Sequence, residues 1–368
     1  MPIVARCTVA PWALALALAP LLACAGHAPL SGPAALHQRR GAQLLATGQV
    51  DRAEAELALA LEYRPHSPEV LNGLGLVAHQ RGQLEAALGH FRAAVLQDDD
   101  FAEAHNNVGV VLLQRGHHEE AAQSFRAALA VDPGYVNARY NLALSLVRLG
   151  QLAAASFELR KVTTLAPALG AARAELGCVL VQLGRAAAGD RELRAALALD
   201  PGLGAAHRCL GQLLRLRGDP AAAEPLLREA LRLDPSDAAA LYELAVSLVV
   251  LGRRDAAETE LWRVVRRQPA WAPGHFVLGH VLAAAGRWQQ AVQRLRRAVS
   301  LAPRYAAAQL LLGDALVQSG QAELAREPYR HFLGDPPREL RLETERVRRW
   351  MASATTSGRT PVLGRARL

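Results

Sequence analysis

Small and large apolar residues recur along most of the chain at a constant interval of 34 residues. Glycines mark this interval: Gly48, Gly82, Gly116, Gly150, Gly184, Gly218, Gly252, Gly286 and Gly320. With this glycine set as position 15, position 20 is Ala in eight of nine repeats, position 24 is always large and apolar, and position 32 is Pro in eight. Glycine commonly ends a helix and proline cannot continue one. The pattern predicts two helices per repeat, the first ending at position 15 and the second before position 32.

Small residues inside the predicted helices indicate how the helices pack. Position 8 is Gly in seven repeats and Ala in the other two. A glycine within a helix costs about 0.5–1 kcal/mol relative to Ala, so its recurrence predicts a neighbouring helix too close for a side chain. Each repeat is then an antiparallel helix pair that buries its apolar face by stacking on its neighbours.

These positions resemble those of the tetratricopeptide repeat, and the resemblance covers residues 34–339 of the 368-residue chain. It implies an all-α, right-handed α-solenoid of nine helix pairs. The predicted units are 34–67, 68–101, 102–135, 136–169, 170–203, 204–237, 238–271, 272–305 and 306–339. After them, an amphipathic helix over 340–351 is expected to cap the array, and residues 352–368 to form a flexible basic tail.

The amino-acid composition favours helices, and the distribution of charge argues against a nucleic-acid partner. Apolar residues make up 51% of the chain but aromatics only 5%, a mixture that favours helices over strands. The net charge is +8, yet from Arg338 onward eight arginines stand against three glutamates, so most of the excess lies at the C-terminus. The repeats themselves are nearly neutral, and we expect no nucleic-acid partner.

The N-terminus has the pattern of an exported protein. Residues 7–23 are mainly apolar and too short to span a membrane, as in a signal peptide over 1–23. The following run Leu21-Leu22-Ala23-Cys24 resembles a bacterial lipobox. That resemblance implies a lipid-modified Cys24, a linker over 24–33 and, because Ala25 rather than Asp follows, attachment to the periplasmic face of the outer membrane. The alternative is an ordinary leader cleaved elsewhere, with Cys24 removed.

Two internal cysteines, Cys178 and Cys209, fall on neighbouring first helices. An oxidising periplasm permits a disulfide between them. The alternative that we favour from sequence is two small buried thiols.

The sequence offers no catalytic arrangement. The residues after the array are too few for a catalytic domain, and no phosphate-binding loop, Ser/His/Asp set or zinc spacing occurs. His37, His105, His207 and His275 share position 4, which indicates a packing role between repeats. We therefore expect no enzyme activity, no cofactor and no metal site.

The resemblance implies instead a partner-binding groove along the first helices, on which positions 2, 5, 6, 9, 12 and 13 usually face the partner. The early units place polar residues there and the later units apolar ones, which favours an extended partner segment. The predicted groove residues are Glu69, Asn72, Glu103, Asn106, Asn107, Tyr140, Asn141, Arg148, Arg208, Arg215, Tyr242, Val246, Val249, Phe276 and His280.

The favoured hypothesis is a non-enzymatic scaffold that binds envelope proteins and is held at the membrane by its lipid anchor. Resemblance to tetratricopeptide lipoproteins that assemble type IV pilus secretins gives one version of it, and a broader envelope-assembly scaffold gives another. One alternative is an envelope-polymer or anionic-surface binder acting through the Arg-rich C-terminus. Another is a targeting subunit for an enzyme on a separate chain. The sequence does not define the oligomeric state.

Overall fold

The computed structural model describes residues 32–337 and 340–353, and every regular element among them is a helix. The chain divides into two compact units, Met1–Ala206 and His207–Leu368, and helix α11 (Gly204–Leu216) contains the boundary. The predicted all-α repeat fold is confirmed. The predicted signal peptide, Cys24 and residues 354–368 lie outside the described residues.

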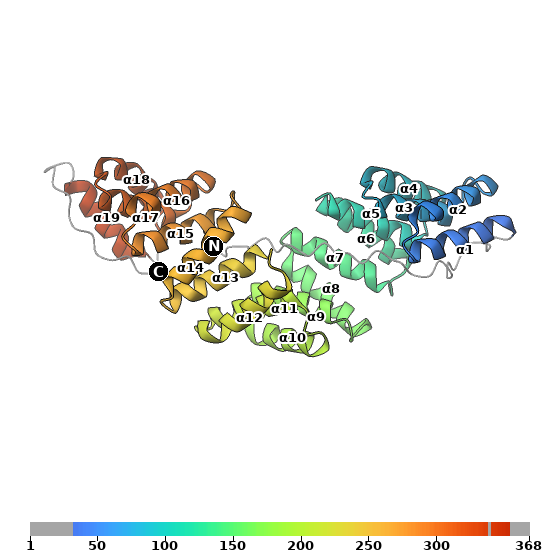
Figure 1. The fold of residues 1–368 in the computed structure, drawn as a ribbon, viewed down its shortest axis with the longest axis horizontal. Coiled ribbons are helices and arrows are strands. Elements are labelled where there is room, and N and C mark those ends of the chain that lie inside the picture. Colours follow the sequence, from blue (N-terminus) through green and yellow to red (C-terminus); the bar gives the residue numbers. More distant parts are fainter. Residues whose placement is uncertain (1–31, 338–339, 354–368) are drawn as a thin grey trace. The chain divides into compact units, whose positions relative to one another are not determined.

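The first unit contains five helix pairs in which each helix packs on the one before it and the one after it. Its helices (Figure 1) are α1 (Pro33–Ala46), α2 (Val50–Tyr63), α3 (Pro68–Gln80), α4 (Leu84–Gln97), α5 (Ala102–Gln114), α6 (His118–Val131), α7 (Val136–Arg148), α8 (Leu152–Leu165), α9 (Gly170–Gln182) and α10 (Ala186–Leu199).

The second unit continues the pattern and ends differently. Its helices are α12 (Pro220–Leu233), α13 (Ala238–Val250), α14 (Arg254–Arg267), α15 (Ala272–Ala284), α16 (Trp288–Leu301), α17 (Ala306–Gln318), the 3-10 helix η1 (Ala322–Ala325), α18 (Arg326–Gly334) and α19 (Arg341–Ser353). In the last pair the second helix begins as η1, and Pro328, which has no backbone N–H, lies in the first turn of α18.

Glycine recurs at positions 15 and 8 of the repeat for two different physical reasons. Gly116, at position 15, has a φ of 83° with no heavy atom within 4 Å of a built Cβ, so the left-handed backbone alone selects glycine. Gly109, at position 8, is helical, but a Cβ there would lie 2.6 Å from Cε1 of Phe125. Phe125, like the position-24 residue of every repeat, is fully buried. The small residue therefore admits the large side chain of the facing helix.

Helix α19 closes the second unit at the place where the sequence predicts a cap. Arg346 on α19 donates to Oδ2 of buried Asp314 at 2.8 Å, and the Tyr329 hydroxyl donates to Oδ1 at 2.6 Å. Trp350 packs edge-on against Tyr329 with ring centroids 5.0 Å apart. Burial raises the pKa of Asp314, and the Arg346 guanidinium opposes that rise. The cap therefore covers the last apolar face while satisfying a buried carboxyl group.

The cysteines depart from the alternative that we favoured. Cys178 and Cys209 are both buried, but each is disulfide-bonded. The expectation of two reduced thiols is therefore wrong.

Replacing Gly116 with Ala should lower the free energy of unfolding by about 1–2 kcal/mol, because an L residue would have to adopt a left-handed backbone. Gly89 is the matched control, since it lies exposed within α4 with no atom near a built Cβ. There the same substitution should be neutral or stabilising by about 0.5–1 kcal/mol. Urea unfolding followed by circular dichroism measures both, and equal midpoints for the two variants would contradict this account of the turn.

Candidate functional site

The first helices of the first unit are joined by a chain of asparagine side chains. Asn141 Nδ2 donates to Asn106 Oδ1 at 3.0 Å, Asn106 Nδ2 to Asn107 Oδ1 at 3.3 Å, and Asn107 Nδ2 to Asn72 Oδ1 at 3.0 Å. Each link between units joins position 6 of one repeat to position 5 of the repeat before it. The amides therefore connect α3, α5 and α7.

These four asparagines were predicted to face a partner, and the structure corrects that placement. Asn106, Asn107 and Asn141 are 0% exposed and Asn72 is 3% exposed. Tyr140 is also buried. Burying an amide is costly unless it is hydrogen-bonded, and these amides bond across the helices. They support the inner face of the first unit rather than form its accessible surface.

The remaining predicted residues of the first unit, Glu69, Glu103 and Arg148, are half-buried. Glu69 accepts a hydrogen bond from the Ser67 hydroxyl at 2.6 Å, beside the start of α3. Burial raises the pKa of Glu103, and the carboxylates of Asp132 and Asp98 raise it further. Two of these three half-buried side chains are carboxyl groups, and the third is a guanidinium.

Side chains at position 4 of a repeat form hydrogen bonds to the repeat before it. His105 bonds through Nε2 to the Asp99 carbonyl at 2.8 Å, and His275 to the Pro269 carbonyl at 3.1 Å. In each case the acceptor is position 32 of the preceding repeat, and Gln309 donates to Pro303 in the same way. His105 and His275 therefore satisfy a carbonyl at the end of the preceding helix pair, whereas His37 in the first repeat bonds to Glu56.

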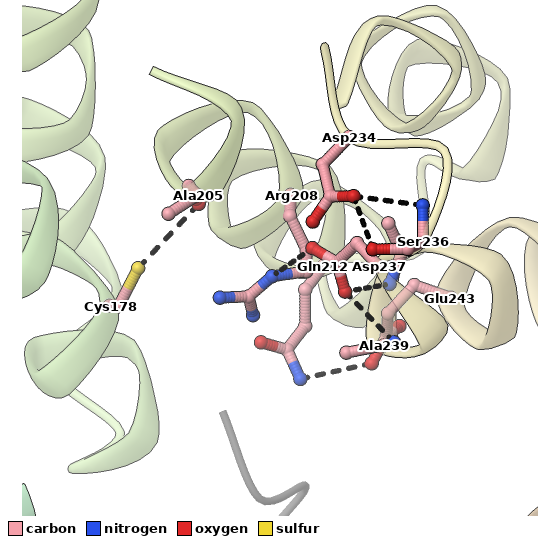
Figure 2. A network of polar contacts seen from close by, with 10 residues as sticks. Cys178, Ala205, Arg208, Gln212, Asp234, Ser236, Asp237, Ala239 and Glu243 are labelled. Carbon is pink, nitrogen blue, oxygen red and sulfur yellow. Dashed lines mark hydrogen bonds and ion pairs between the residues drawn. The ribbon is translucent and has the colours of Figure 1, made fainter. Parts of the chain in front are cut away.

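In the second unit, the predicted groove arginines are held by acidic partners (Figure 2). Arg208 Nε lies 3.0 Å from Asp237 Oδ2, and Asp237 Oδ1 also accepts the backbone N–H groups of Ala239 and Ala240 at the start of α13. Because Arg208 is buried and paired, it does not form accessible groove surface.

A second polar contact lies beside it. Glu243 is buried and accepts hydrogen bonds from Gln212 Nε2 at 3.0 Å and Arg215 Nε at 2.6 Å. Figure 2 shows Gln212 directed at this carboxylate. Arg215 remains half-buried, so its guanidinium is oriented by Glu243 while part of it stays accessible. The arginines of this face are therefore preorganised rather than freely moving.

Further along the second unit, aromatic rings pack against each other in pairs. Tyr242 packs edge-on against Trp271 with centroids 4.8 Å apart, and Phe276 packs against Tyr305, also at 4.8 Å. All four rings are half-buried. We call these four residues the aromatic row. Burial raises the pKa of Tyr242 to about 12, so its hydroxyl stays neutral near pH 7.

Sequence reasoning identified only half of the aromatic row. It named Tyr242 and Phe276 at position 5 but missed Trp271 and Tyr305, which occupy position 34 of the same repeats. Asp237, the partner of Arg208, is also at position 34. In all three contacts the residue at position 5 pairs with the residue at position 34 of the same repeat. Considering these two positions together in the sequence could have identified Trp271, Tyr305 and Asp237.

The predicted residues Val246, Val249 and His280 complete this face and are all half-buried. Val246 and Val249 pack against the core of the second unit together with Tyr242 and Phe276. Burial lowers the pKa of His280, and nearby Arg254 lowers it further. Within the part of the chain that the structure describes, this is the predicted groove segment with accessible apolar surface.

The described residues contain no group of three side chains suited to a metal ion. None of the described helices is long and apolar enough to cross a membrane.

The stacked antiparallel pairs define a helical-repeat protein. Two family profiles described as tetratricopeptide repeat match the chain, one at residues 39–104, 87–134, 174–238 and 276–338, the other at 112–176 and 214–275. The chain belongs to the tetratricopeptide repeat family, whose members are in general protein-interaction scaffolds.

Solved structures of similar fold include the APC/C hetero-tetramer Cut9-Hcn1, at TM-score 0.61 and 21% identity over 77% of this chain and 55% of that chain. A tetratricopeptide repeat protein from Parabacteroides merdae has TM-score 0.55 and 18% identity over 68% of this chain and 98% of that one. Pseudomonas aeruginosa pilF has TM-score 0.52 and 20% identity, covering 56% and 95%.

The chain spans about half the length of the Cut9-Hcn1 chain that it matches. At these identities the likenesses show the fold alone. Comparison with curated protein sequences gives no match.

Acidification should destabilise the protein in part through His280. Because burial lowers its folded-state pKa below the ordinary value of 6.5, the unfolded chain binds the proton first as pH falls. The stability that neutral His280 contributes is present above about pH 6.5 and is lost as the pH falls from there through the lowered folded-state pKa. Thermal melts at pH 7.5 and pH 5 should therefore show a smaller loss in His280→Gln than in wild type.

The exposed His331 in the same unit is the control. His331→Gln should leave the loss of stability between the two pH values unchanged. If His280→Gln loses as much stability as wild type, burial of His280 is not a source of the pH dependence.

Proposed function

We propose that the protein is a non-enzymatic scaffold that binds an extended segment of a partner protein along the first helices of its second unit. The observation that carries this proposal is the aromatic row with Val246 and Val249 beside it. The side chains are half-buried, the rings pack against each other within each pair, and Tyr242, Phe276 and the two valines pack against the core of the unit. They therefore offer apolar surface whose side-chain entropy is already reduced before a partner binds.

Aromatic side chains in fixed positions are the usual energetic anchors of protein interfaces. The row extends over successive repeats, so an extended segment contacts several anchors in sequence. Arg215, oriented by Glu243, lies in the repeat before the row and supplies a positive charge. We infer a partner segment with apolar or aromatic residues and an acidic group near one end.

Within this proposal the scaffold is an envelope lipoprotein anchored through Cys24 at the periplasmic face of the outer membrane. The lipobox-like run ending at Cys24 supports the anchor. The disulfide-bonded state of Cys178 and Cys209 suits an oxidising compartment rather than a reducing one. Assembly of a pilus, a secretin or another envelope machine is the process in which such a scaffold would act.

The test separates the anchor from the binding surface in the native host. Wild type, Cys24→Ser, the double variant Tyr242→Ala/Phe276→Ala, and Leu324→Ala are each crosslinked in cells, fractionated and purified. Leu324 is the control because it is an exposed apolar residue of the second unit outside the row. The double variant should stay in the membrane fraction and bind the crosslinked partner at least about thirtyfold more weakly, as loss of an anchor worth about 2 kcal/mol implies.

Cys24→Ser should show the opposite behaviour, leaving the membrane fraction while retaining the partner. Mass spectrometry of the wild-type N-terminus should find an acylated Cys24. Unchanged partner binding by the double variant, with its fold intact by circular dichroism, would refute the binding surface. An unmodified N-terminus would refute the anchor and leave the binding surface standing.

A further inference from the structure

The second helices of the first unit present arginine at one recurring position. Position 25 is Arg92 on α4, Arg126 on α6, Arg160 on α8 and Arg194 on α10, and all four side chains are exposed. We call these four residues the arginine row. In the second unit, position 25 is again exposed arginine at Arg228, Arg296 and Arg330. Within the first unit, the same position of four second helices therefore carries an exposed cation.

The arginine row is largely free of acidic neighbours. Within four residues of Arg92 and Arg126 the sequence has no Asp or Glu, and the one carboxylate that close to Arg160, Glu158, pairs with Arg139 and Lys161. The described residues place no ion-pair partner on these three guanidinium groups, whereas Arg194 pairs with Asp190 at 3.0 Å. Arginines in the turns before α4 and α6 behave differently, since Arg81 pairs with Asp51 and Arg115 with Glu85. Positive potential therefore accumulates along the row.

Exposed apolar side chains lie on the same set of helices. In the described first unit, the large apolar residues that are exposed on second helices are Leu59, Tyr63, Leu96, Val131, Phe157, Leu165 and Leu199, with Leu36 the one on a first helix. Leu96 is 83% exposed one turn after Arg92, and Phe157 is 58% exposed one turn before Arg160. Lys161 Nζ lies 4.2 Å from the Phe157 ring centroid. Exposed arginines and exposed apolar side chains thus occur on the same helices, and on α4 and α8 they lie one turn apart.

We propose that this face, formed by α4, α6, α8 and α10, docks on the surface of an anionic lipid bilayer. Cations beside protruding apolar side chains match the headgroup region of a membrane, where phosphates meet the acyl boundary. An exposed arginine and an exposed apolar side chain occur together on each of these four helices. Such repetition fits a partner that presents the same chemistry everywhere, as lipid does, better than a folded protein with one complementary patch. The docking does not depend on acylation of Cys24.

The test uses purified full-length chain carrying Cys24→Ser, so that no acyl chain contributes. Sedimentation with vesicles of phosphatidylethanolamine and phosphatidylglycerol, and with neutral vesicles, measures partitioning. The row variant is Arg92→Glu/Arg126→Glu/Arg160→Glu. Its control, Arg39→Glu/Arg40→Glu/Arg185→Glu, makes the same change in net charge at exposed arginines outside the row. Every protein carries the same leader, whose contribution cancels.

The row variant should partition onto anionic vesicles at least about tenfold more weakly, since each arginine near an anionic surface contributes about fivefold. The control should change by less than about threefold. Binding of the Cys24→Ser parent to anionic vesicles should weaken as salt rises, and the row and control variants should bind neutral vesicles as weakly as that parent does. Leu96→Ser/Phe157→Ser should also weaken binding, because the bilayer accepts apolar side chains.

Several results would overturn the proposal. Equal losses in the row and control variants would show that net charge alone acts. Binding to soluble polyglutamate without binding to anionic vesicles would assign the face to an acidic polymer or protein. If charge reversal unfolds the row variant by circular dichroism, the corresponding Arg→Gln triple variant repeats the comparison, and unchanged partitioning by that folded variant refutes the docking face.

Discussion

The close approach of the two helices in each pair is the constraint on which the rest of the structure depends. A large position-24 side chain on the second helix fills the space left by the small residue at position 8 of the first, as Phe125 does against Gly109. The position-24 residues are fully buried in all nine repeats. No pair covers its own apolar surface completely, so each depends on the next, and α19 is needed to close the second unit.

Once packing is supplied by this contact, the exposed faces of the helices are free to differ. The inner face of the first unit is supported by buried amides that bond from one repeat to the next. The inner face of the second unit instead holds buried arginine–carboxylate pairs and then half-buried aromatic rings. The proposed partner surface follows from this difference, because only accessible apolar side chains held in place offer binding energy without a large ordering cost. The outer face of the first unit adds arginines with few acidic neighbours.

The sequence predicts the helix pairs well because their signals are local and repeated. Gly116 requires a left-handed backbone, which leaves Gly at position 15 of every repeat, and Gly109 requires space, which leaves Gly or Ala at position 8. The site was predicted less well because side-chain contacts between repeats join different repeat positions. Asn107 bonds to Asn72, 35 residues away, rather than to its own counterpart in the neighbouring repeat, so reading one position at a time assigned buried amides to an accessible groove. Position 34 was overlooked for the same reason, and Trp271 and Tyr305 with it.

The two proposals together give the protein two different partners on two faces, a protein segment and a lipid surface. The most direct measurement replaces Tyr242 or Phe157, in separate strains, with a photo-reactive phenylalanine analogue and identifies the adducts formed in living cells. The account predicts a protein adduct from position 242 and a lipid adduct, detected as an added lipid mass, from position 157. A protein adduct from position 157 with none from position 242 would contradict it.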